Sequence, residues 1–211
     1  MAPGSLPAGV ARVADRDRVV GPATRVVLLV EGLSDRVAVE VLADRRGHDL
    51  AAAGVAVVPM GGATAVRAHA ERFGPGGRGL TLGGLYDAAE ERAVGRALER
   101  AGLGTGLDRA ALEDLGFYGC DADLEDELIR ALGVAGVEAV LDRQGDLASF
   151  RRFQAQPAQR DRPAAAQLHR FMGTRSGRKW QYAALLTDAV DLAAVPRPLD
   201  LMLSRALAAA G

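Results

Sequence analysis

The sequence has little cysteine, little lysine, few aromatic residues and no long apolar run. Its single cysteine, Cys120, excludes an intrachain disulfide framework and a zinc site built from several cysteines, and it favours a reducing compartment. The opening stretch MAPGSLPAGVARVADRDR lacks the apolar segment of a secretory leader, and no later run is long enough to cross a bilayer. We therefore expect a cytoplasmic protein that is not inserted in a membrane.

Lysine is almost absent, because Lys179 is the single lysine and the other 25 of the 26 basic residues are arginine. We attribute the arginine to coding bias toward GC-rich codons, which replaces lysine wherever a positive charge alone is needed. A retained lysine is then a pointer to chemistry, since a compact ammonium can be placed against a single phosphoryl oxygen. Chance retention on the surface is the alternative explanation.

The formal net charge of −1 hides a separation of charge along the chain. Residues 113–146 hold ten acidic residues and two arginines, whereas residues 151–179 hold eight basic residues and one acidic residue. Such a separation suits a protein that holds cations in one place and a polyanion in another. Two solvated helix faces that neutralise each other would give the same pattern.

Short β-branched runs alternate with helical patterns through the first two thirds of the chain. Alternation of this kind predicts an α/β fold, an open parallel sheet of about four strands with crossover helices. After residue 133 only helices are predicted. We expect a loose tail over residues 1–24, an α/β core over 25–133 and a helical C-terminal extension over 134–211. The predicted strands are 24–30, 55–59, 80–87 and 116–120, and the helices between and after them are 34–47, 63–73, 88–102 and 123–133.

Acidic residues follow the predicted strands at their carboxyl ends, where open parallel sheets bind ligands. Each alone could be a helix cap, but crowded carboxylates repel one another unless a cation or shared protons neutralise them. Oxygen ligands without histidine or cysteine favour Mg²⁺ or Mn²⁺ over zinc. The acids are Glu31 after the first strand, Asp87 at the third, Asp121 and Asp123 after the fourth, and Asp35 and Glu125 in the helical turns that follow.

Two glycine-containing stretches suggest phosphate contacts. Gly61 and Gly62 lie between the second strand and the second helix, where a bare backbone could approach a phosphate, although a tight turn explains the pair equally well. The stretch GTRSGRK resembles a P-loop only superficially, because Arg178 and Trp180 stand where that motif needs a glycine and a hydroxyl around the lysine. We expect no ATP-binding loop of that type.

Five stretches together resemble a known family, namely VEGLSD, VVPMGGATAV, GLYDAAEE, DADLEDELIRALG and GTRSGRKWQYA. They are similar to the TOPRIM (topoisomerase–primase) domain in the form found in the overcoming-lysogenization-defect (OLD) nucleases, over about residues 24–190. The acidic helix and the C-terminal lysine segment favour the OLD type over topoisomerases and primases. The resemblance implies a metal-dependent nuclease or endonuclease that acts on DNA.

The resemblance also implies two divalent ions, Mg²⁺ or Mn²⁺, and their ligands. Glu31 and Asp87 would hold one ion, and Asp35 with Asp123 or Glu125 would hold the second. The sequence departs from the family pattern at the second acid of the DxD pair, because Asp87 is followed by two alanines. Glu90, Glu91 or water would have to fill that coordination position.

For the substrate, the resemblance implies that Lys179, with Ser176 close by, neutralises charge at the scissile phosphate. Glu31 and Lys179 are then the expected catalytic residues. Arginines between 151 and 178, with Arg175 and Arg178 nearest the lysine, would grip the nucleic-acid backbone without reading its sequence. We expect the three histidines and Cys120 to take no part in the chemistry.

Family members usually carry an ATPase domain, for which these 211 residues leave no room, so we expect activity without ATP or beside a separately encoded ATPase. Two other functions stay open: a nucleic-acid-binding or regulatory module with little turnover, and a nucleotidyl or phosphoryl transferase. The sequence leaves open DNA against RNA, nicking against exonuclease action, and the oligomeric state.

Overall fold

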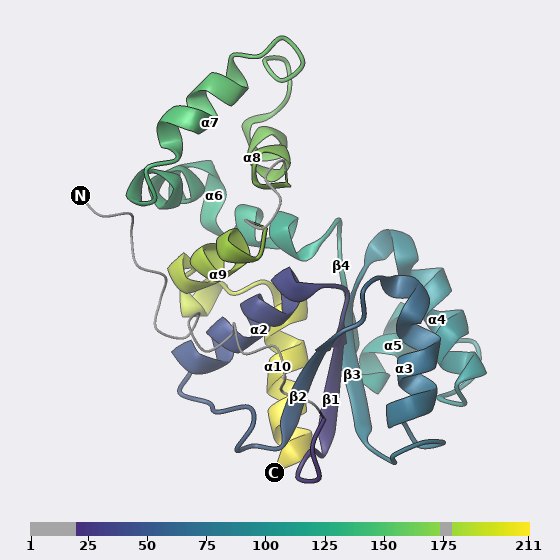
Figure 1. Cartoon of the computed structure of the whole chain (residues 1–211). Helices are drawn as coiled ribbons and strands as arrows, with labels where there is room; N and C mark the ends of the chain where they lie inside the picture. The colour runs from purple at the N-terminus through teal and green to yellow at the C-terminus, as the bar shows by residue number, and fades with distance from the viewer. Residues whose placement is uncertain (1–19, 174–178) are drawn as a thin grey trace.

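The described residues, 20–173 and 179–211 of a computed structural model, form one four-stranded parallel sheet with helices on both faces (Figure 1). The sheet order is β2-β1-β3-β4 and all three pairings are parallel, so the four carboxyl ends lie at the same edge. The predicted α/β fold with about four strands is confirmed. The strands are β1 (Val26–Val30), β2 (Val55–Pro59), β3 (Thr81–Asp87) and β4 (Phe117–Cys120).

β1 lies inside the sheet and is buried along its whole length. Its side chains alternate between two cores: Val26, Leu28 and Val30 join one hydrophobic cluster, and Val27 and Leu29 join the other. A strand covered on both faces needs apolar residues at every position. The continuous run VVLLV meets that need.

The two helical layers are unequal. The smaller layer packs on one face of the sheet, and Figure 1 shows it to the right of the strands. It consists of α3 (Val66–Phe73), α4 (Glu91–Arg100) and α5 (Arg109–Leu115). The larger layer supplies the main core cluster on the other face. It contains α2 (Leu33–Arg45), α6 (Leu124–Arg143), α9 (Lys179–Ala189) and α10 (Arg197–Ala210). Elsewhere in the chain, 3₁₀ turns lie at 63–65, 88–90 and 192–194.

A helical arm, which we define as residues 134–173, extends beyond the carboxyl edge of the sheet (Figure 1). It contains the second half of α6, α7 (Leu147–Gln154) and α8 (Ala164–Gly173). Phe171 packs against Phe150 and Phe153, with ring centroids 5.3 and 5.6 Å apart. The arm begins at Gly133, where α6 kinks because that residue has φ of 66°. The helix predicted to end at Gly133 therefore turns there and continues.

One helix, α5, is absent from the sequence prediction. It is only seven residues long, but both of its ends carry recognisable signals. The Asp108 side chain accepts a hydrogen bond from the Ala111 amide at 2.9 Å, and Gly116 ends the helix in the left-handed conformation. These end signals, rather than apolar periodicity, identify a helix this short.

The last helix, α10, returns to the sheet and packs against β1, β3 and β4. Leu199, Met202 and Leu203 are buried in the same cluster as the β1 side chains. Residues on both sides of position 133 thus share one core. The domain boundary drawn there stays a prediction.

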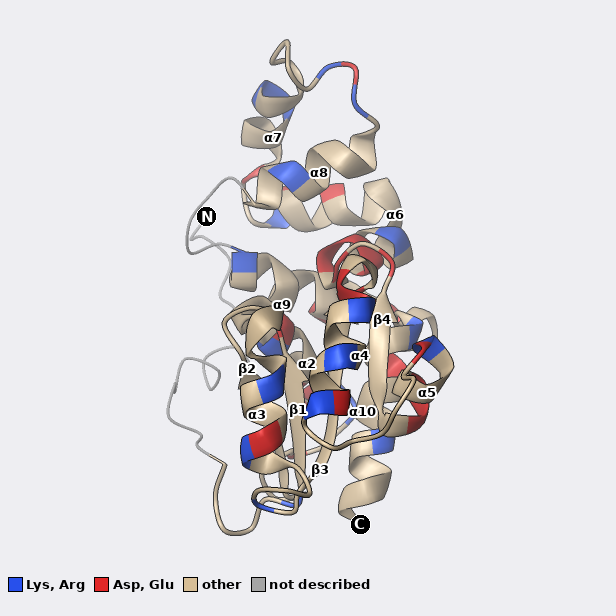
Figure 2. Ribbon diagram, turned by 90° about the vertical axis from the view of Figure 1, so that its right-hand side faces the viewer, with Lys and Arg blue, Asp and Glu red and all other residues tan. Residues whose placement is uncertain are grey.

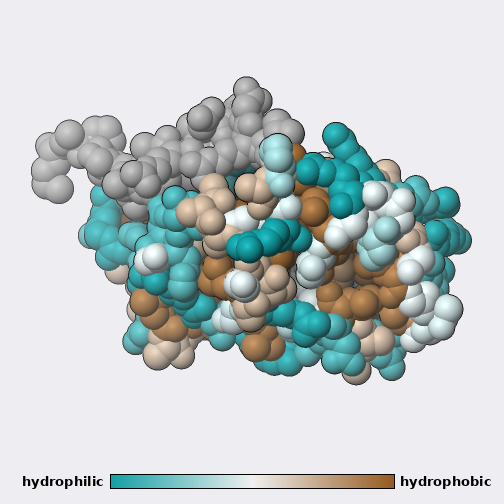
Figure 3. All heavy atoms as spheres, turned by 90° about the horizontal axis from the view of Figure 1, so that it is seen from below, coloured by the Kyte–Doolittle hydropathy of each residue, from teal (hydrophilic) through white to brown (hydrophobic). Residues whose placement is uncertain are grey.

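Within the described chain, no helix has the length and apolar character needed to cross a membrane. Figure 3 views the molecule from below, and on that face apolar residues form small groups between hydrophilic ones. Among the described residues, Leu192 is the large hydrophobic side chain that is exposed, at 40%.

Candidate metal and phosphate site

The end of β1 supplies the first two acids of the site. Glu31 directly follows the strand and is exposed. Asp35 lies in the first turn of α2, and its carboxylate reaches back to accept a hydrogen bond from the Gly32 amide at 2.9 Å. This capping contact holds Asp35 at the helix N-terminus, where acids are favoured, beside the strand end.

β3 pairs with β1 and supplies the third acid. Asp87 is its last residue, and repulsion from Glu31 is among the causes that raise the pKa of Asp87. Glu90 lies in the turn that follows; burial and then the charge of Glu31 raise its pKa. Glu91, by contrast, pairs with Arg109 at 2.7 Å. Of the two acids that could replace the missing DxD partner, Glu90 is therefore the one that faces the site.

Two acids at this edge of the sheet have raised pKa values, which indicates that nearby positive charge does not balance the negative charge. Burial raises the pKa of Asp35 to about 6, with further contributions from Glu125 and Glu31. Burial and the neighbouring Glu31 and Asp123 raise the pKa of Asp87 to about 7. Acids with raised pKa values in a cluster are typical of sites that bind a cation or a proton.

Lys179 lies beside these acids, at the first turn of α9. Its Nζ is 3.1 Å from Oε1 of Glu125, which is only 4% exposed. That oxygen makes no hydrogen bond within the described residues, so the ion pair is its main compensation. Burial lowers the pKa of Lys179, but Glu125, Asp123 and Asp35 outweigh it and the pKa is raised. The fold thus brings the single lysine to the acidic edge, as the resemblance implied.

Asp123 is engaged differently from the other acids. One oxygen caps α6 by accepting from the Asp126 amide at 2.8 Å, and the other lies 2.7 Å from Nε2 of His169. Burial raises the pKa of Asp123, but these two contacts outweigh it and the pKa is lowered. Of the two ligands suggested for the second ion, Asp123 has both oxygens hydrogen-bonded, whereas Oε1 of Glu125 has only its ion pair with Lys179.

His169 is a residue that the sequence analysis misses. It lies on α8 of the arm, and its bond to Asp123 is the first cause of its raised pKa. The contact links the arm to the sheet edge across 46 positions of sequence. No local pattern signals it, because the two residues meet only through the fold.

The phosphate contact expected from Gly61 and Gly62 is not supported. Their amides donate to the backbone carbonyl of Glu31 at 3.0 and 3.3 Å, so both N–H groups fasten the loop to β1. Their φ angles of 77° and 123° explain the glycines, since other residues rarely adopt them. Three other residues expected at the phosphate lie outside the described residues, namely Ser176, Arg175 and Arg178.

Two more residues near the strand ends take no part in the site. Asp121 pairs with Arg130 at 3.0 Å and is largely exposed. Cys120 is buried, and burial raises the pKa of its thiol far above its usual range. Because the thiolate is the reactive form of cysteine, this burial disfavours reaction at the thiol.

Comparison with known proteins agrees with this geometry. Residues 24–73, which hold β1, α2, β2 and α3, match the family model described as the overcoming lysogenization defect protein-like TOPRIM domain. This first part of the chain is thus similar to an OLD-like TOPRIM domain. No curated protein sequence matches the chain significantly.

Solved structures extend the likeness to most of the chain. The C-terminal region of the OLD protein of Xanthomonas campestris pv. campestris is 23% identical, with a TM-score of 0.67, over 89% of this chain and 94% of that one. The C-terminal region of the Burkholderia pseudomallei OLD protein is 19% identical, with the same TM-score, over 89% and 99%. At these identities the likeness establishes the shared fold.

The acids at this edge of the sheet suit a hard divalent cation, because they offer carboxylate oxygens. Such an ion would relieve the raised pKa values of Asp35 and Asp87 and would give the buried Oε1 of Glu125, which has no hydrogen bond within the described residues, a second partner besides Lys179. Among the described residues, no group of three histidine, cysteine or acidic side chains is close enough to hold an ion. The acids therefore form a region of negative charge rather than a completed coordination shell.

Proposed function

We propose that this chain is an OLD-like TOPRIM nuclease that hydrolyses phosphodiester bonds in DNA and depends on Mg²⁺ or Mn²⁺. One observation carries the proposal: acids at the ends of β1 and β3 meet the buried Glu125 and the single lysine at one edge of the sheet. An uncompensated acidic cluster with one adjacent ammonium suits metal-assisted chemistry on a phosphate.

The proposed ligands are the carboxylates at this edge that no arginine or histidine of the described residues pairs with. Glu31 and Asp87, with Glu90 in place of the missing DxD acid, would hold one ion, and Asp35 with Glu125 would hold the second. Two bound ions activate a water nucleophile and stabilise the leaving oxygen of an in-line displacement. We propose two ions because the acids lie in two groups, at the ends of β1 and β3 and at the α2–α6 helix ends.

Lys179 would supply fixed positive charge at the phosphate. Its raised pKa keeps the amine protonated at neutral pH, and its side chain is 56% exposed, so it is accessible to a substrate. A preorganised donor of this kind is typically worth about 3 kcal/mol in the transition state. The neighbouring Glu125 would position the amine in the free protein.

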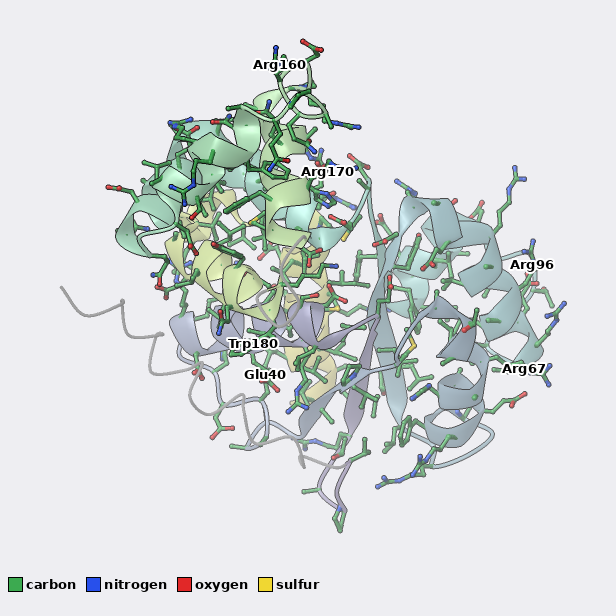
Figure 4. All side chains as sticks on the ribbon, turned by 45° about the horizontal axis from the view of Figure 1, so that its top comes forward. Glu40, Arg67, Arg96, Arg160, Arg170 and Trp180 are labelled. Carbon is green, nitrogen blue, oxygen red and sulfur yellow. The ribbon has the colours of Figure 1, made fainter. Side chains whose placement is uncertain are left out.

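The arm would add contacts to the nucleic-acid backbone. Arg160 and Arg170 are exposed on it (Figure 4), as are Arg152 and Arg162. Arg151 is less suited, because both of its terminal nitrogens bond to Glu138, at 2.8 and 2.6 Å. We also propose that the reaction needs no ATP bound by these residues.

The experiment is cleavage of supercoiled plasmid with Mg²⁺ or Mn²⁺, with and without EDTA, by the wild-type protein, Glu31→Ala and Lys179→Ala. We expect loss of at least about 100-fold in each variant, the usual effect of removing one electrostatic stabiliser. Glu71→Ala is the matched control, since Glu71 is an exposed acid paired with Arg67 on α3. Equal cleavage by all four proteins would refute the assignment of the site.

One observation favours a second function, a nucleic-acid-binding or regulatory module without turnover. Ala89 stands where the second DxD acid is expected, and no three-ligand group is formed in the described part of the chain. This alternative predicts salt-sensitive DNA binding with no cleavage in any divalent metal. The plasmid experiment separates the two, provided that binding is measured in the same buffers.

A further inference from the structure

The outer face of α4 carries a row of arginines that the site described above does not use. Arg92, Arg96 and Arg100 are spaced four residues apart, so they lie on one face of the helix, and all three are exposed. We call these three residues the α4 arginine column. Figure 2 shows blue segments one above another along α4, and Figure 4 shows Arg96 on the outside of the α3–α4 layer.

The column has no compensating charge of its own. Within the described chain, none of the three guanidinium groups makes a hydrogen bond or an ion pair. The glutamates of this layer are engaged elsewhere: Glu91 binds Arg109, Glu71 binds Arg67, and Glu99 accepts from the Leu107 amide. Like charges four residues apart on a helix repel each other and destabilise it. The fold therefore carries a local cost that an external anion would relieve.

The column begins at the candidate site. α4 starts at Glu91, directly after Glu90, which lies beside Glu31 at the carboxyl edge of the sheet. From there each arginine is about 6 Å further along the helix axis than the last. This step is of the order of the distance between successive phosphates of a nucleic-acid strand. The geometry is that of a track that leads away from the acidic edge.

We propose that the α4 arginine column binds the phosphate backbone of the nucleic acid whose scissile phosphate lies at the acidic edge. The proposal rests on the proposed nuclease function and adds a binding surface on the layer opposite α10, separate from the arm. A backbone contact of this kind is independent of sequence and weakens with salt.

Nucleic acid fits the column better than an acidic protein does. Protein interfaces usually centre on large apolar or aromatic side chains. On α4 the exposed neighbour of the column is Ala93, and the large apolar residues Val94 and Leu98 are buried in the core. A surface with regular positive charge and no apolar centre matches a regular polyanion.

The test is binding of a fluorescent DNA duplex in EDTA, by anisotropy, over a series of salt concentrations. The variant is Arg92→Gln/Arg96→Gln/Arg100→Gln. Each lost phosphate contact lowers the slope of log K against log salt by about 0.9, so the slope should fall by about 2.7, with at least about tenfold weaker binding at low salt. Circular dichroism and thermal melting check that the variant is folded.

The matched control is Arg46→Gln/Arg197→Gln/Arg205→Gln. It also removes three positive charges, but from the α2–α10 side of the sheet. These arginines are engaged with Asp200, Glu113 and the Asp114 carbonyl. The control should keep the wild-type slope and affinity. Hydrolysis of bis(4-nitrophenyl) phosphate, which is too small to span the column, should be unchanged in both triple variants.

The outcomes separate this proposal from the proposed function. If wild type binds and cleaves DNA but the α4 variant keeps its affinity and salt slope, the column proposal is wrong and the nuclease assignment stands. If wild type binds DNA through the column without cleaving it, the column proposal stands and the nuclease assignment fails. Loss of binding to poly-glutamate but not to DNA in the α4 variant would overturn the proposal in favour of an acidic protein partner.

Discussion

At the scale of single residues, Asp35 and Asp87 make the fold sensitive to pH. The ordinary pKa of aspartate, 3.8, applies in the unfolded chain. In the fold, mainly through burial, the pKa is about 6 for Asp35 and about 7 for Asp87. The folded protein therefore binds these protons more tightly than the unfolded chain does. Their stabilising effect is complete below pH 3.8 and is lost as the pH rises through about 6 and 7.

We therefore predict that metal-free protein loses stability through these two groups as the pH rises from about 4 to 8. Asp87→Asn should remove part of that loss and raise the free energy of unfolding at pH 8 by about 1–2 kcal/mol, after allowance for solvent screening. Urea denaturation in EDTA at several pH values measures this. Asp161→Asn, at an exposed position of the arm, is the control. If stability depended on pH in Asp87→Asn as it does in the wild-type protein, the raised pKa of Asp87 would be contradicted.

Residue-scale contacts were predictable only where a local motif indicates them. The strand-end positions of Glu31 and Asp87 follow from the sequence, because apolar runs end directly before them or at them. The sequence did not show which of Asp123 and Glu125 is available to bind an ion, since this depends on which carboxylate His169 contacts. A contact made across the fold leaves no trace in spacing along the chain.

At the scale of elements, the kink in α6 sets the direction of the arm. Gly133 has φ of 66°, and a Cβ added there would meet nothing within 4 Å. Any cost of a larger residue is therefore a backbone cost and not a packing cost.

Gly133→Ala should then destabilise the protein by about 1–2 kcal/mol, the cost of a left-handed residue with a Cβ. Gly133→Asn should cost less, because asparagine tolerates this conformation better. Urea denaturation of the three proteins at one pH compares them. Equal stability of all three would show that the kink is not held in the left-handed region in solution.

The apolar strands and the long helix α2 were predicted better than the short helix α5. β1 and β2 follow from β-branched runs, and α2 from a helical pattern that ends in Gly47. α5 was missed because its seven residues span fewer than two full turns of apolar periodicity. Its capping residues Asp108 and Gly116 carried the signal that was not used.

At the scale of the whole molecule, metal binding should be visible as stability. A ligand that binds only the folded state stabilises it by about 2.7 kcal/mol at 100 times its Kd. We predict that Mg²⁺ or Mn²⁺ raises the Tm of the wild-type protein above its value in EDTA. The rise should be reduced in Glu31→Gln and Asp87→Asn and unchanged in Glu71→Gln. A Tm that is indifferent to both metals would contradict a carboxylate metal site.

The overall α/β architecture was predictable from alternation of strand and helix patterns. The strand order and the position of α10 were not, since both depend on long-range packing. The sequence predicts that the final helix belongs to a separate extension, yet its apolar face completes the core on β1, β3 and β4. Periodicity shows that a helix has an apolar face but not which surface covers it.

This return of α10 has a consequence for synthesis. During translation, β1, β3 and β4 leave the ribosome well before Leu199, Met202 and Leu203, which cover one side of them. Until the last residues emerge, a nascent chain would present an uncovered apolar sheet, the kind of surface that chaperones recognise. A stop codon just before α10 would leave every acid of the candidate site in place and still remove the helix that packs on one face of β1, β3 and β4.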